Sequence, residues 1–173
     1  MNPLYSNRLS LANGARVWPD FNLTVELSYM SATVSVTAAR PGKAITILLW
    51  IAQVLLAVLF GLAGVMKTFM PVPALVANGI NYAADLPVWL LRFIGVAELS
   101  GAVGVVMPAL TRIMPRLTPL AALGFVSIQV LAIGFHAMRG ELAMALPLNL
   151  VLLGLSLFVL WGRSTRAPLA ARF

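Results

Sequence analysis

Four long apolar segments determine what this chain can fold into. They cover residues 44–66, 86–107, 117–137 and 142–161, and each reaches the roughly 20 residues that a helix needs to cross a bilayer. Hydrophobic residues make up 61% of the 173 positions and charged residues only 10%, whereas soluble domains carry about 25% charged residues. We therefore predict an all-α membrane protein, a bundle of four transmembrane helices without a separate soluble domain.

The polar segment before the first helix contains neither a helical stripe nor a long alternating strand. Residues 1–43 mix Asn, Ser, Thr, Pro and Arg, so we expect a disordered polar N-terminal leader. Its early part lacks the compact apolar region of a signal peptide. Met30 is a candidate true start, because the residues from Met30 to Lys43 form a short polar leader by themselves. Residues 162–173 are expected to form a basic cytoplasmic tail.

The basic residues indicate how the bundle lies in the membrane. Lysine and arginine are more frequent in loops on the cytoplasmic side of a membrane. Only Lys67 and Arg139 flank the predicted helices on one side, and seven residues do so on the other: Arg40, Lys43, Arg112, Arg116, Arg163, Arg166 and Arg172. We therefore expect both termini to be cytoplasmic.

Because the formal charge of +7 is spread between apolar segments and forms no basic surface with interleaved aromatic residues, we do not expect a nucleic-acid partner.

The connections between the segments show recognisable turn signals. A short interfacial helix is expected at residues 73–78, before the Asn78-Gly79 turn, and Asp85 is expected to be the N-cap of the second helix, with Pro87 in its first turn. Residues 139–141 are expected to form a tight turn.

The second segment carries two charges at membrane depth, Arg92 and Glu98. Each costs roughly 3 kcal/mol or more on insertion scales unless it faces protein, water or an opposite charge. The two residues are six positions apart, about 120° around a helix, so they do not form a pair along it. We expect Glu98 to pair with Lys67 or His136. Arg92 is expected to meet backbone carbonyls, Gln129, Glu141 or a ligand.

Most polar side chains within the segments belong to the outer half of the predicted bundle. With both termini inside, Arg92 lies about 9 Å and Glu98 about 18 Å below the outer end, and Gln129 and Asn149 lie at about 10–12 Å. The inner half is expected to be apolar apart from Gln53, and a pocket that opens outward fits this distribution. The candidates for ligand binding or proton relay are Lys67, Arg92, Glu98, Gln129, His136 and Asn149.

A structural interpretation of the same residues stands beside the functional one. The charges would then form a buried network that fixes helix register, Gln129 and Asn149 would form hydrogen bonds between helices, and Lys67 would be an interface anchor. His136 would be an interface residue in this interpretation, although its ordinary pKa near neutrality also suits a proton carrier.

Small residues recur where helices can approach closely. The first helix has such a face at Ala57, Gly61 and Gly64, and the second at Ala97, Gly101 and Gly104. A second face of the first helix carries Gln53, Phe60 and Lys67, seven residues apart.

Several kinds of chemistry have no residues to support them. The chain has no cysteine and a single histidine, so it offers no thiol chemistry, no Fe–S ligation and no His-rich metal site. Phosphate-cradling glycine loops, Ser-His-Asp arrangements and metal-spaced clusters are also missing. We therefore predict no metal site and no cofactor held by the chain's own covalent or metal chemistry, and the sequence identifies no catalytic residue.

Three short motifs resemble the DoxX-like family of small four-helix membrane proteins. They are F-G-L-A-G-V-M-K at 60–67, R-F-I-G-V-A-E-L-S-G-A at 92–102, and L-T-P-L-A-A at 117–122, followed by His136. The resemblance covers residues 44–161 and implies a bundle in the bacterial cytoplasmic (inner) membrane. By position, it matches the family's polar residues to Lys67, Arg92, Glu98 and His136.

The resemblance implies a redox role, because some members are linked to quinone-coupled sulfur oxidation and others to thiol or oxidative-stress systems. We expect an accessory subunit of a membrane redox system, with a quinone or similar amphiphile bound in the outer pocket, a soluble redox partner protein and a homo-oligomer as further partners. The cysteines of some redox-associated members are missing here, which argues against a thiol role. The alternatives are a non-enzymatic assembly or cargo-binding membrane protein and a small-solute transporter.

Overall fold

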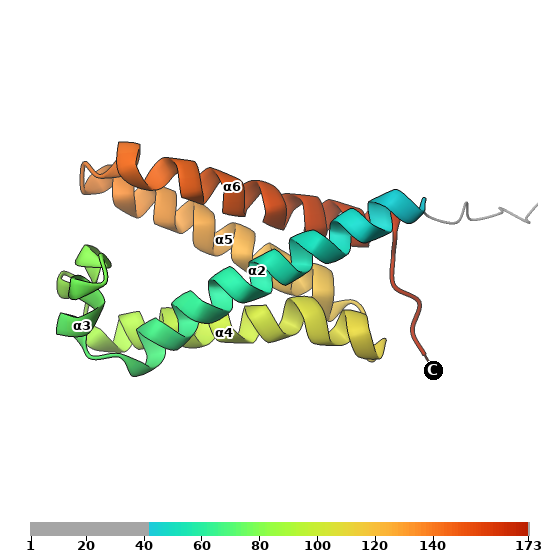
Figure 1. Cartoon of the computed structure of the whole chain (residues 1–173), viewed down its shortest axis with the longest axis horizontal. Helices are drawn as coiled ribbons and strands as arrows, with labels where there is room; N and C mark the ends of the chain where they lie inside the picture. The colour runs from blue at the N-terminus through green and yellow to red at the C-terminus, as the bar shows by residue number, and fades with distance from the viewer. Residues whose placement is uncertain (1–41, 173) are drawn as a thin grey trace, which may run out of the picture. The chain divides into compact units, whose positions relative to one another are not determined.

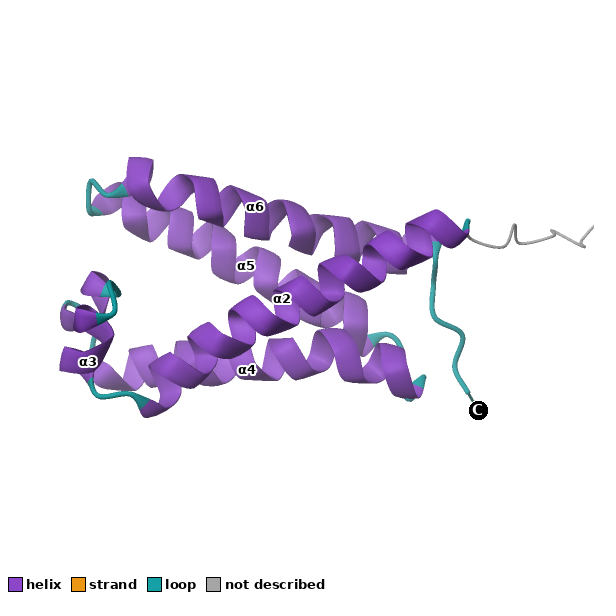
Figure 2. Ribbon diagram, viewed as in Figure 1, coloured by secondary structure: helices purple, strands orange, loops and turns teal. Residues whose placement is uncertain are grey.

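The computed structural model describes residues 42–172, and these residues form the predicted four-helix bundle. Four helices in this range are long and apolar enough to cross a membrane. They are α2 (Lys43–Phe69), α4 (Val88–Thr111), α5 (Leu117–Met138) and α6 (Leu142–Trp161). The described part is all-helical, without strands (Figure 2), and the predicted fold class is confirmed. The predictions for residues 1–41, including the start at Met30, lie outside the described residues.

Successive long helices run in opposite directions, so the bundle has two distinct ends (Figure 1). The loop end holds the short helix α3 (Val72–Ala77), the 3₁₀ turn η1 (Asn81–Ala84) and the turn between α5 and α6. The arginine end holds the start of α2, the turn between α4 and α5, and the π-helical turn η2 (Gly162–Arg166) that continues α6. Helix α2 packs against both α4 and α6, and α5 packs against α4 and α6.

The outer surface of the bundle is built for contact with lipid. Large apolar side chains point outward from the long helices, for example Phe93 (65% exposed) and Leu131 (72% exposed). Apolar patches of this extent are rare on soluble monomers, whereas hydrocarbon chains cover them at no cost. The chain is therefore an integral membrane protein with the bilayer as its environment.

The helix ends differ from the predicted ends in two instructive places. Pro87 is the N-cap of α4, and the prediction that Asp85 caps this helix is wrong, because Asp85 forms an ion pair with Arg139 instead. Helix α4 also continues through Pro108 to Thr111, and it ends where Arg112 adopts the left-handed conformation (φ 59°) that commonly stops helices.

Candidate functional site

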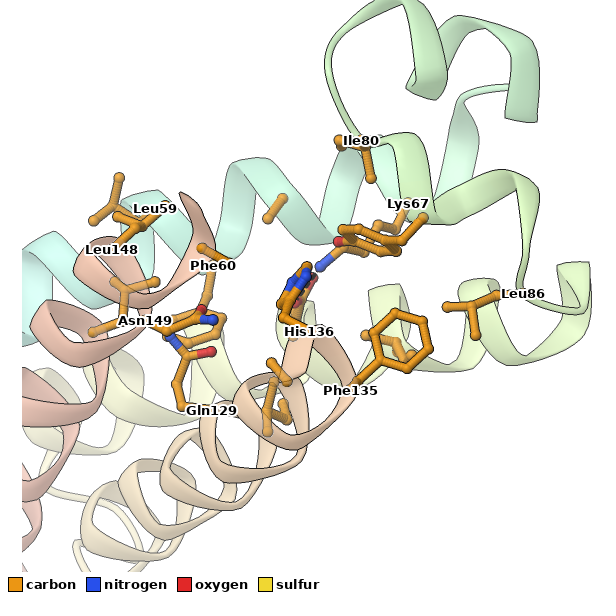
Figure 3. Close-up of a pocket in the computed structure, with 18 of the residues that line it drawn as sticks. Leu59, Phe60, Lys67, Ile80, Leu86, Gln129, Phe135, His136, Leu148 and Asn149 are labelled. Carbon is orange, nitrogen blue, oxygen red and sulfur yellow. Dashed lines mark hydrogen bonds and ion pairs between the residues drawn. The ribbon is translucent and has the colours of Figure 1, made fainter. Parts of the chain in front are cut away.

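A cavity of about 380 Å³ lies between the four long helices toward the loop end (Figure 3). Most of its wall is apolar and includes Phe60, Ile94, Phe135 and Leu148. Five of the six predicted site residues line it, namely Lys67, Glu98, Gln129, His136 and Asn149. The structure therefore brings together polar groups from α2, α4, α5 and α6 that are up to 82 residues apart in sequence, from Lys67 to Asn149.

An ion pair between Lys67 and Glu98 forms the charged part of this wall. The Lys67 Nζ donates to Glu98 Oε1 over 2.5 Å, and both side chains are buried. Lys67 is one of the two partners that the sequence predicted for Glu98. The second carboxylate oxygen, Oε2, is also buried and has no hydrogen-bond partner among the described residues. Glu98 therefore retains an acceptor, or a place for a proton, beside the cavity.

Arg92 does not line the cavity, and its contact is structural. Its Nη1 donates to the backbone carbonyl of Lys67 over 2.5 Å, one of the partners that the sequence left open. The last four carbonyls of a helix have no partner within the helix, and a cation there also interacts favourably with the helix dipole. Arg92 thus caps the end of α2 from α4, and it fixes the backbone that carries Lys67.

The amides of Gln129 and Asn149 face the cavity from α5 and α6 (Figure 3). Both side chains are buried, and neither Gln129 Nε2 nor Asn149 Nδ2 has a hydrogen-bond partner among the described residues. A buried donor without a partner costs about 1–3 kcal/mol. These two amides are therefore poorly explained as interhelical hydrogen bonds, and they are available to a bound molecule.

His136 lies at the loop-end side of the cavity, among aromatic rings. Its ring meets those of Tyr82 and Phe135 edge to face, at centroid distances of 5.5 and 5.9 Å. Its Nδ1 lies 3.5 Å from Glu141 Oε2. Tyr82 also lines the cavity. It was not predicted to do so, because the sequence does not indicate where the side chain of a loop tyrosine points.

Arg139 closes the loop end by joining two loops. Its Nε and Nη2 donate to the Glu141 carboxylate over 3.0 and 2.9 Å, and its Nη1 donates to Asp85. Hydrogen bonds from Arg139 lower the pKa of the Glu141 carboxyl, and those to Glu141 and Asp85 raise the pKa of Arg139 above its ordinary value. The opposite charges of these loops, which the sequence placed on one side of the membrane, are the signal that would have identified the contact.

The glycines of the predicted small-residue faces lie at helix contacts. Gly95, which also lies at the contact between α2 and α4, was not predicted. A Cβ on Gly64 would lie 2.8 Å from the carbonyl of Gly95, and one on Gly61 would touch Ala102 at 3.7 Å. Gly101 and Gly104 face Phe125 and Ala121 of α5 instead. The remaining predicted members, Ala57 and Ala97, are half-buried.

The arginine end also differs from the expectation of an apolar inner half. Arg163, which was assigned to the basic tail, is buried, and its Nε and Nη2 donate to Gln53 Oε1. The end of α6 continues as η2, and this extra turn carries Arg163 back against α2.

Comparison with known proteins gives one match. The model of the DoxX-like family matches residues 51–159, which is more than half of the chain and includes all of α4 and α5 and most of α2 and α6. Neither a curated protein nor a solved structure shows significant similarity to the chain.

Proposed function

The chain belongs to the DoxX-like family, and from this premise we propose that it is an accessory subunit of a membrane redox system that binds an isoprenoid quinone in the cavity between its helices. The single observation that carries the proposal is the pair of unpartnered amides, Gln129 and Asn149, in the wall of a largely apolar cavity. Donors of this kind match a ligand that combines acceptor oxygens with an apolar body.

A quinone fits the residues that are present. Its two carbonyl oxygens accept hydrogen bonds, which Gln129 Nε2 and Asn149 Nδ2 are free to donate. Its flat ring suits the aromatic wall at Phe60 and Phe135, and its apolar tail suits the lipid-facing helices. A bound quinone would supply two-electron, two-proton chemistry that the side chains of the chain lack.

In this proposal each polar side chain of the cavity has a distinct task. The amides of Gln129 and Asn149 orient the head group, and the Lys67–Glu98 pair holds a proton site at the unpartnered Glu98 Oε2. His136, next to Glu141, exchanges protons with the surface. Since the chain has no cysteine, we propose that electrons come from a soluble partner protein.

We further propose that the arginine end faces the cytoplasm, which places both termini inside and the cavity toward the outer face of a bacterial inner membrane. The described residues support this orientation by their charges. Six lysines and arginines lie at the arginine end: Lys43, Arg112, Arg116, Arg163, Arg166 and Arg172. The basic residues of the loop-end half, in contrast, contact carboxylates or a helix end.

Calorimetric titration of the full-length protein in lipid nanodiscs with a short-chain benzoquinone tests the proposal. Gln129→Leu and Asn149→Leu should each weaken binding about fivefold, the value of one ordinary hydrogen bond. Because the nitrogens of these amides have no partner among residues 42–172, neither change should lower the thermal midpoint appreciably. Ser156→Ala is the matched control, since Ser156 is buried on α6 and its hydroxyl donates to the Leu152 carbonyl of the same helix. Binding that is equally strong in all four proteins would contradict the proposal.

One observation favours a second candidate, a non-enzymatic assembly or cargo-binding protein. Lys67 pairs with Glu98, and Arg92 donates to the backbone carbonyl of Lys67, as expected of charges that hold a bundle together. This candidate leaves the amides of Gln129 and Asn149 unexplained. The Gln129→Leu/Asn149→Leu double variant separates the two, because quinone binding that is lost while the fold is kept supports the site, and a wild-type protein that binds no quinone supports the assembly role.

A further inference from the structure

The charges at the arginine end are not balanced within the described residues. Six cations lie there, and the three described carboxylates, Asp85, Glu98 and Glu141, all lie in the cavity or at the loop end. Each of these three is paired with a lysine or arginine of its own half. The described carboxylates therefore supply no counter-charge to the arginine end.

Arg163 is the buried cation of this end, and its contacts within the described residues are with neutral groups. It is only 4% exposed, its guanidinium lies 5.4 Å from the centre of the Trp50 ring, and two of its nitrogens donate to Gln53 Oε1 over 2.8 and 2.5 Å. Gln53 is itself fixed, because its Nε2 donates to the Val105 carbonyl over 2.5 Å. These partners are neutral. A buried charge without a counter-charge is costly, so the side chain is held in place but its charge is not compensated by the described residues.

A second hollow, of about 450 Å³, opens beside this guanidinium. Its polar wall consists of Arg116, Arg163 and Ser164, which we call the arginine cradle, and Pro115, Pro119 and Pro168 form rigid sides. The chain after η2 completes the hollow with Leu169 and Ala171. This segment is fixed to the end of α4, since the Arg172 amide donates to the Arg112 carbonyl over 3.2 Å.

We propose that the arginine cradle binds the phosphate of an anionic phospholipid. Guanidinium groups bind phosphate through paired, charge-assisted hydrogen bonds, and the Ser164 hydroxyl adds a further donor. Basic pockets at the ends of membrane helices recognise anionic head groups in this way.

The position of the hollow selects a lipid rather than a soluble phosphate. It lies at the first turn of α5, where Leu117 and Leu120 are exposed to the bilayer. A phospholipid with its phosphate in the cradle would place its acyl chains along this surface. The site is separate from the quinone cavity and does not depend on it.

Native mass spectrometry of the full-length protein in detergent, titrated with phosphatidylglycerol or phosphatidylcholine of equal chain length, tests the proposal. The decisive variant is Arg116→Gln, because this side chain is exposed and its loss should leave the fold intact. The matched control is Arg166→Gln, which removes the same charge from the same end. Arg166 is exposed, lies over the Trp161 ring and does not line the hollow.

We expect wild-type protein to prefer phosphatidylglycerol and Arg116→Gln to bind it about fivefold more weakly, the effect of one basic residue near an anionic lipid. Arg166→Gln should lose much less, and a large excess of inorganic phosphate should not displace the lipid. Equal losses in the two variants, or no preference between the lipids, would overturn the proposal. Displacement by inorganic phosphate would overturn the assignment to a lipid.

Discussion

Lys67 and Glu98 illustrate how two charges persist at membrane depth. Their 2.5 Å contact compensates each charge, and Arg92 compensates its own by binding the end of α2. A buried pair adds little net stability over an apolar one, but the loss of one partner leaves an uncompensated charge and costs about 3–5 kcal/mol. The pair therefore contributes mainly to the specificity of the helix arrangement and little to its net stability.

A double-mutant cycle measures this coupling. Glu98→Gln alone should destabilise the bundle by about 3–5 kcal/mol, because it leaves Lys67 charged and buried. Lys67→Met with Glu98→Gln should cost clearly less than the two single changes together. The measurement is reversible unfolding in mixed micelles, with the exposed Ser100→Ala as control. Additive single effects would show that the two side chains do not interact.

The contact between Glu141 and Arg139 should make the stability of the loop end depend on pH in the acid range. The hydrogen bonds from Arg139, assisted by nearby His136, lower the pKa of the Glu141 carboxyl below its ordinary value of 4.5. A lowered pKa in the folded state means that the stabilisation is complete above the unfolded value and is lost as the pH falls through the folded one. The turn between α5 and α6 should therefore weaken only at pH values below 4.5.

The comparison of wild type with Arg139→Gln isolates this contribution. The difference between their thermal midpoints should be constant near neutral pH and should shrink below pH 4.5, because protonated Glu141 no longer gains from the arginine. A difference that stays constant through this range would show that the contact does not titrate as described.

Among the helices, α2 and α4 make the closest contact, and glycine makes it possible. A Cβ on Gly95 would lie 2.5 Å from Thr68 Oγ1, 2.9 Å from the Thr68 amide and 3.0 Å from the Gly64 carbonyl. Two of these atoms belong to the backbone and cannot rotate away. The approach of the two helices also places Lys67 and Arg92 within reach of each other, so helix packing and the charged network depend on the same contact.

Gly95→Ala should therefore destabilise the bundle by about 1–3 kcal/mol, the usual cost of an overpacked contact. Gly124→Ala is the matched control on α5, because a Cβ there meets nothing within 4 Å. Thermal unfolding in the same detergent compares the two. If both variants melt alike, the close approach of α2 and α4 is not what Gly95 provides.

The helices could be predicted almost completely from the sequence, whereas their pairing could not. Hydropathy identifies which segments cross the membrane, because lipid-facing side chains are predominantly apolar. Spacing alone identified the face of Gly61 and Gly64 but not the partner Gly95, since a small-residue pattern does not say which neighbour it meets. Asp85 was misplaced for a similar reason, because its preference for a helix cap was weaker than its attraction to Arg139 in a distant loop.

The molecule as a whole divides into two ends with different electrostatic character. In the loop-end half the described carboxylates are paired with Lys67 and Arg139, whereas at the arginine end no described carboxylate pairs with a cation, and Arg163 and Arg166 contact Gln53 and aromatic rings. The sequence predicted that Lys67, Glu98, Gln129, His136 and Asn149 would lie in the outer half, because position along a helix gives depth. It did not predict the buried Arg163, because the extra turn at the end of α6 carries no hydrophobic signal.

Native mass spectrometry of protein released gently from its own membrane shows directly whether the cavity holds a quinone. We expect a bound mass that matches a quinone in the wild type. That mass should be lost in the Gln129→Leu/Asn149→Leu double variant and retained in Ser156→Ala. A wild-type protein without such a mass, or a double variant that retains it, would contradict the assignment of the cavity to a quinone.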